Sequence, residues 1–189
     1  KLRHLLYSIN QTTEGGFWHK DKYPYQMWLD GLFMAAPFML MYNEHFVEEE
    51  LVLNVVRQEK LMRTHMKDKN TGLLFHAWDE KKAQPWADKE TGCSPEFWGR
   101  SVGWYGTALV DILELINGSR GQEEMEQSLK DLVPAITKFQ DEETGLWYQI
   151  VDKGDLDDNW LESSCSSLFI YFIAKAIKLG LVDDSYQQV

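Results

Sequence analysis

Cysteine is scarce in this chain, and several familiar sequence motifs are missing from it. The two cysteines, Cys93 and Cys165, lie far apart and match no metal-ligand spacing, so we expect neither a disulfide framework nor a metal site. The sequence contains no glycine-rich phosphate loop and no serine nucleophile elbow. No apolar run approaches the roughly 20 residues of a membrane-spanning helix. These absences argue against disulfide-rich, P-loop and membrane proteins.

Positive charge is also in short supply. The chain has 19 lysines and arginines against 30 aspartates and glutamates, which gives a net charge of −11. Its short lysine groups are mixed with acidic residues and cannot neutralise a phosphate backbone, so we expect no nucleic-acid partner. An anionic ligand would need a local cationic pocket, because the overall field repels it.

Aromatic residues, by contrast, are abundant and make up 13% of the sequence. Several of them stand beside Gly, Asp, His or Arg and not inside apolar runs. Aromatic faces beside hydrogen-bonding groups are typical of sugar-binding sites, although ordinary core packing also uses such side chains. Composition therefore leaves a carbohydrate-binding protein and an aromatic-rich core as alternatives.

The periodicity of apolar residues predicts an all-α fold. A phrase in which glycine precedes bulky residues occurs at 14–19, 71–76 and 144–149. A unit that recurs in this way indicates stacked helical hairpins, either an α-solenoid or a closed α/α toroid, in which the aromatic phrases form small β-bridges but no sheet. The first predicted helix ends near residue 6 and the second begins at 30. The others cover 46–66, 101–116 with a stop at Asn117-Gly118, 123–139 and 163–179.

The organisation of the chain is simple at this level. No linker divides it, so residues 1–189 are expected to form one helical-hairpin repeat domain. The sequence begins at Lys1 within a helix-like pattern, and we expect the natural N-terminus to lie upstream. The sequence leaves the oligomeric state open. It leaves the compartment open between cytoplasm and periplasm, of which we prefer the cytoplasm.

Polar residues recur where each long loop meets the next helix. The first loop ends in Trp28-Leu29-Asp30, the second in Trp98-Gly99-Arg100, and the third in Glu162-Ser163. In a toroid of hairpins these loop ends would converge on one face around the axis. They would then form a pocket with an acid, a guanidinium and several indoles.

Each of these residues has a structural as well as a functional interpretation. Asp30 could serve as a helix N-cap, or its neighbours Trp28 and Phe33 could exclude water and let it act as a proton donor. Arg100 could bind a carboxylate or form a surface ion pair. His76 could contact a ligand or be a hydrogen-bonded structural residue, with Asp79 as its orienting partner or as a turn residue.

Four motifs taken together resemble a known family. The segments 26–35, 72–80, 98–104 and 162–164 are similar, in the same order, to signatures of the unsaturated rhamnogalacturonyl hydrolases, glycoside hydrolase family 105. The resemblance implies an (α/α)6 barrel of six hairpins. Family members are considerably longer than this chain, so an incomplete barrel that lacks N- and C-terminal helices is expected here.

The resemblance also implies roles for particular residues. Asp30 corresponds to the acid/base aspartate of the family, and the pocket residues of the family correspond to Trp28, His76, Trp98, Arg100 and Trp104. The implied substrate is a pectin-derived oligosaccharide that ends in a Δ4,5-unsaturated uronic acid. The implied reaction hydrates the C4=C5 double bond, needs no metal or cofactor, and uses one carboxyl group as acid and then as base.

Other functions remain open at this point. The chain could be a degenerate member that binds carbohydrate without turnover, or an unsaturated glucuronyl hydrolase that acts on glycosaminoglycan-type disaccharides. It could also be an inverting six-hairpin glycosidase that uses Asp30 with a second acid such as Asp79. A helical scaffold that binds another protein would instead need a large exposed apolar patch and no convergent Asp/Arg pocket.

Overall fold

Six α-helices and a short 3-10 helix dominate the computed structural model, which describes residues 1–116, 118 and 121–189. The helices are α1 (Leu2–Ser8), α2 (Asp30–Phe46), α3 (Glu49–Met66), α4 (Gly99–Leu115), α5 (Gln122–Thr137), α6 (Ser163–Lys178) and the 3-10 helix η1 (Asp184–Gln188). Two strands, β1 (Gln26–Trp28) and β2 (Ala77–Asp79), lie between them. None of the helices in the described ranges is long and apolar enough to span a membrane.

The predicted helices are confirmed, with small differences at their ends. The helix predicted over 46–66 begins at Glu49, because α2 continues to Phe46 and Val47 then adopts a left-handed conformation with φ of 51°. Gly118 also has a positive φ, whereas Asn117, the other half of the predicted stop, lies outside the described residues. η1 follows α6 and was not predicted.

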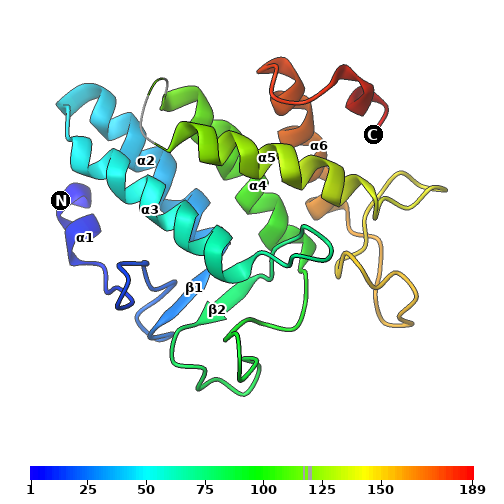
Figure 1. The fold of residues 1–189 in the computed structure, drawn as a ribbon, viewed down its shortest axis with the longest axis horizontal. Helices are drawn as coiled ribbons and strands as arrows, with labels where there is room; N and C mark the ends of the chain where they lie inside the picture. Colours follow the sequence, from blue (N-terminus) through cyan, green and yellow to red (C-terminus); the bar gives the residue numbers. More distant parts are fainter. Residues whose placement is uncertain (117, 119–120) are drawn as a thin grey trace.

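The helices form hairpins in two layers. α4 packs against both α2 and α6, whereas α3 packs on α2 and α5 packs on α4. In Figure 1, β1, β2 and the long loops lie along one edge of the helices, where α2, α4 and α6 all begin. The arrangement is the predicted α/α organisation, in which alternate helices start at the same face.

The aromatic phrases form isolated β-bridges, as predicted, but a two-stranded sheet that was not predicted lies next to them in the sequence. β1 and β2 pair in an antiparallel two-stranded sheet with Trp28 opposite Ala77. These strands are only three residues long, so the alternation on which a sequence-based strand assignment rests is too short to be visible. The same edge carries isolated bridges, among them Trp98 with Ile150 and Tyr148 with Leu161.

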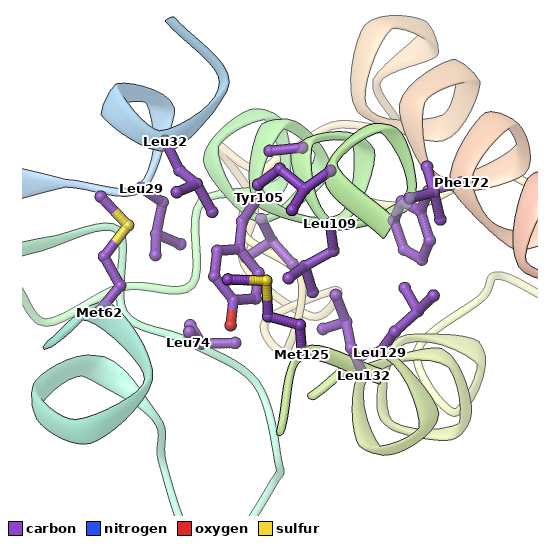
Figure 2. Packing of buried hydrophobic residues seen from close by; sticks show 14 of the residues in the cluster. Leu29, Leu32, Met62, Leu74, Tyr105, Leu109, Met125, Leu129, Leu132 and Phe172 are labelled. Atoms are coloured by element: carbon purple, nitrogen blue, oxygen red, sulfur yellow. The ribbon is translucent and has the colours of Figure 1, made fainter. Parts of the chain in front are cut away.

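The core lies around α4. Figure 2 shows Tyr105 and Leu109 of this helix surrounded by apolar side chains from α2, α3, α5 and α6, and each of the two is at most 1% exposed. At one end of this core the carboxylate of Glu59, on α3, accepts hydrogen bonds from Tyr105 (2.8 Å) and Ser128 (2.9 Å). Burial and the neighbouring Glu59 carboxylate raise the pKa of Tyr105, which keeps the phenol a donor.

Three glycines let α4 approach α6 closely. A Cβ atom added at Gly103 would lie 2.7 Å from Leu168 Cβ, and one added at Gly99 would lie 2.9 Å from Cys165 Cβ. A Cβ atom added at Gly106 would collide with the ring of Phe172, which is fully buried. This close contact fixes the relative positions of the loop ends that precede α4 and α6.

Candidate active site

The backbone of the two-stranded sheet brings the first predicted site residues together. Trp28 pairs with Ala77, and the next amide, Leu29 N–H, donates to the carbonyl of His76 at 3.1 Å. Asp30 follows immediately as the first residue of α2. The Asp30 loop end and the His76 loop are therefore held side by side by main-chain hydrogen bonds.

Aromatic rings line this junction. The His19 imidazole stacks on the Trp28 indole with centroids 4.3 Å apart, and Tyr23 lies nearly parallel to the same indole at 5.2 Å. His76 meets Trp28 edge-on at 5.6 Å and Trp98 edge-on at 5.8 Å. The His76 ring thus lies between two of the predicted pocket indoles, as the convergence of the loop ends required.

The position and burial of Asp30 make it a candidate for the catalytic acid. Leu29 occupies the N-cap position and no side chain caps α2, so the alternative in which Asp30 is the N-cap is wrong. Its Oδ2 atom is buried and has no hydrogen-bond partner among the described residues. A carboxylate oxygen buried in this way is costly unless a ligand or proton satisfies it.

A pocket opens beside Asp30. It encloses about 390 Å³ and is lined by Asp30, Phe33, Met34 and Trp104, of which the Phe33 and Trp104 rings pack at 4.6 Å. Met34 also lines a second, largely apolar cavity of about 290 Å³ that reaches His19 and Trp28. Trp104 is therefore brought to Asp30 as predicted, and aromatic surface surrounds the carboxyl group.

The charge of Asp30 acts on two buried histidines. Burial lowers the pKa of His76 and of His19, and in both the Asp30 carboxylate opposes the shift. Each Nδ1 atom is buried without a partner among the described residues. Both rings are therefore neutral near pH 7 and can donate or accept a hydrogen bond.

We expect His76 to titrate below 6.5 in the folded protein, as followed by the NMR shifts of its ring. Between the two pKa values the His76 imidazole is protonated in the unfolded chain but neutral in the folded chain. The free energy of unfolding should therefore fall as the pH drops through 6.5 toward the folded-state pKa. Asp30→Asn should lower the His76 pKa further, because the carboxylate that opposes the shift is gone. The exposed substitution Asp184→Asn is the control. A His76 pKa that is unchanged by Asp30→Asn would show that the two groups are not coupled.

Arg100 lies one repeat further along. Its guanidinium covers the Trp98 ring at 4.4 Å and forms an ion pair through Nη1 with Glu162, whose side chain is only 11% exposed. Ser164 donates to the same Glu162 oxygen at 2.9 Å. The third loop end therefore meets the second as predicted, and the resting partner of Arg100 is a protein carboxylate.

Asp79 does not belong to this constellation. It is 1% exposed, and its carboxylate accepts hydrogen bonds from the backbone amides of Lys81 (3.0 Å), Ala83 (2.8 Å) and Gln84 (2.9 Å). It forms a turn, as one of the two alternatives stated. The hypotheses that it orients His76 or acts as a second acid are wrong, because its oxygens are committed to the backbone.

His19 is the residue that sequence reasoning missed. The signal is in the repeat: His19 lies four positions after Gly15, as His76 lies four positions after Gly72. Comparison of the two phrases at this position would have paired the histidines.

The comparisons with known proteins agree with this architecture. The family model described as Glycosyl Hydrolase Family 88 matches residues 1–189. A solved glycoside hydrolase from family 105 of C. acetobutylicum ATCC 824 is 40% identical, with a TM-score of 0.95, over 99% of this chain and 52% of that chain.

Two curated relatives match more than three quarters of the chain. Protein Atu3128 of Agrobacterium fabrum is 34% identical over 149 residues, which cover 79% of this chain and 63% of the relative. The unsaturated rhamnogalacturonyl hydrolase YesR of Bacillus subtilis is 32% identical over 146 residues, which cover 77% of this chain and 39% of the relative. The chain thus spans between 39% and 63% of these two relatives. Because the family model matches all 189 residues, the chain belongs to Glycosyl Hydrolase Family 88, and its hairpins are those of the (α/α)6 fold that the resemblance to family 105 predicted.

Proposed function

We propose that this chain carries the site of a glycoside hydrolase that removes a Δ4,5-unsaturated uronic acid from rhamnogalacturonan oligosaccharides derived from pectin. Family membership supports a carbohydrate substrate, and the name of the YesR relative supports the rhamnogalacturonyl class. The observation that carries the proposal is the buried Asp30 oxygen beside an aromatic pocket, for which the described part of the chain offers no hydrogen-bond partner.

The chemistry needs a single carboxyl group. Asp30 in its acid form gives its proton to C4 of the enol ether, and C5 acquires oxocarbenium character. The Asp30 carboxylate then takes a proton from a water molecule as the oxygen of that water bonds to C5. The resulting hemiketal opens and the glycosidic bond breaks, so the net change consumes one water and restores the Asp30 proton.

The surrounding residues have complementary roles in this proposal. Trp28, Trp98 and Trp104 offer flat faces to an unsaturated ring, which is itself flattened by its double bond. Arg100 and His76 bind the uronate carboxylate or the ring hydroxyls. The site would take one small oligosaccharide.

The loss of ultraviolet absorbance from the conjugated double bond tests the proposal. We expect this loss with an unsaturated rhamnogalacturonan disaccharide, a slower loss with an unsaturated glucuronyl disaccharide, and no cleavage of saturated disaccharides. Faster turnover of the glucuronyl substrate would reassign the substrate class. Binding without turnover, seen by calorimetry, would indicate a non-catalytic member. The absence of both binding and turnover would refute the proposal.

Arg100→Lys should raise KM about tenfold and change kcat less. Lysine keeps the charge but loses the planar guanidinium that lies on Trp98 and forks toward a carboxylate. Arg3→Lys is a matched control, because Arg3 also covers an aromatic ring, that of Tyr7 at 4.8 Å, and also pairs with a glutamate, Glu48. Steady-state kinetics of the two variants would contradict the assigned role if both left KM unchanged.

A further inference from the structure

Gln149 occupies the same place in its repeat as His76 does in the preceding one. Trp28 pairs with Ala77, the residue after His76, and Trp98 pairs with Ile150, the residue after Gln149. The next amide repeats the pattern, because Leu29 N–H donates to the carbonyl of His76 and Gly99 N–H donates to the carbonyl of Gln149 at 2.7 Å. The backbone of Gln149 therefore has the same position relative to the loop end of Arg100 as the backbone of His76 has relative to the loop end of Asp30.

The other side of Gln149 faces the third loop end. Its N–H donates to the carbonyl of Trp160 at 2.8 Å, and Glu162 N–H donates to the carbonyl of Trp147 at 2.8 Å. The backbone of Gln149 thus lies between the segments that carry Arg100 and Glu162, whose side chains pair with each other.

The side chain of Gln149 has an unmet hydrogen-bond requirement. Its Oε1 atom is buried and has no partner among the described residues. The two residues at the equivalent position of the earlier phrases, His19 and His76, each have a buried ring nitrogen in the same condition. Buried polar atoms without partners are uncommon and costly, so three at one repeat position indicate a shared function.

A fourth copy of the turn provides a contrast. Asp88 accepts hydrogen bonds from the backbone and side chain of Thr91, as Asp141 does from Thr144, and Gly92 and Gly145 both follow with positive φ. The residue four positions after Gly92 is Glu96, which pairs with Lys153 at 2.5 Å. The residue four positions after the turn glycine can therefore have a partner within the protein, so the repeat geometry alone does not explain the missing partners of His19, His76 and Gln149 in the described part of the chain.

We propose that Gln149 is a further substrate-binding residue, whose carboxamide accepts a hydrogen bond from a sugar hydroxyl near Arg100. The inference rests on the proposed function and extends it by one specificity-determining contact. A neutral amide suits this position, because the Arg100–Glu162 pair beside it already balances one charge of each sign.

The test compares Gln149→Ala and the similarly sized Gln149→Leu with wild type on the unsaturated disaccharide, on its 2-deoxy and 3-deoxy forms, and on a methyl glycoside that lacks the second sugar. Gln127→Ala, at an exposed glutamine of α5, is the matched control. We expect both variants at Gln149 to keep the wild-type Tm and to lose about tenfold in kcat/KM on the disaccharide. The loss should disappear with the one substrate that lacks the contacted hydroxyl.

A loss of equal size on every substrate, no loss at all, or unfolding of both variants would overturn the proposal, since each outcome makes the amide structural or idle. The failure of the proposed function looks different, because wild type itself would then turn over none of the substrates. In that case calorimetry with the unsaturated disaccharide decides. Weaker binding by Gln149→Ala than by wild type supports the contact, and equal or absent binding refutes it.

Discussion

Replacing Asp30 with asparagine should reduce kcat on an unsaturated disaccharide by about 10²–10⁴-fold, the range that a general acid–base group contributes. Asparagine fills the same space but can neither release a proton to C4 nor accept one from water. The buried position of Oδ2 in the aromatic pocket is the reason to expect so large an effect. The loss of double-bond absorbance is the measurement.

The interpretation of this experiment depends on an intact fold. Because Asp30 caps no helix, the Asp30→Asn variant should keep the wild-type circular dichroism and Tm. It should also bind the disaccharide, as calorimetry can show, since the indoles and Arg100 are untouched. Asp184→Asn, at an exposed position of η1, provides a matched control with wild-type kinetics. Turnover by Asp30→Asn at the wild-type rate would show that Asp30 is not the acid–base group.

Gly106→Ala should destabilise the protein by about 2 kcal/mol, or roughly 4–8 °C in Tm for a chain of this size. The added methyl group collides with the Phe172 ring, which is fully buried, and overpacking of this kind costs about 3 kcal/mol. The higher helix propensity of alanine returns about 1 kcal/mol.

A glycine in another helix offers a matched comparison. A Cβ atom added at Gly31 of α2 would meet only Met62 Cε, at an ordinary contact distance of 3.9 Å. Gly31→Ala should therefore leave the free energy of unfolding unchanged or raise it by up to about 1 kcal/mol. Thermal and urea denaturation measure both variants, and equal effects of the two substitutions would show that the α4–α6 contact is not tightly packed.

Much of the fold was predictable from the sequence because its helices are long and periodic. The amphipathic stripes located the helices to within a few residues, and the repeated phrases indicated hairpins of one kind. The sheet was missed because Trp28 and Ala77 belong to strands of three residues that are stabilised by pairing across a long separation in sequence. Local pattern contains no information on such pairs.

The candidate site was only partly accessible to sequence reasoning. Asp30, His76 and Arg100 were found because they stand beside tryptophans in recognisable motifs. The functional hypotheses for Asp79 were wrong because the sequence of a motif does not show whether a carboxylate faces a ligand or, as here, the amides of its own turn. His19 stands outside these motifs, and its sequence signal is its place four positions after a turn glycine, which it shares with His76; its stacking on Trp28 then places it beside them.

The common starting edge of α2, α4 and α6 has an electrostatic consequence (Figure 1). Peptide dipoles align along each helix and leave a partial positive charge of about half a unit at its first turn. The three helix starts therefore place partial positive charge of main-chain origin along this edge, within a protein whose net charge is −11. A negatively charged sugar would therefore be attracted locally even where a mutation removes a basic side chain.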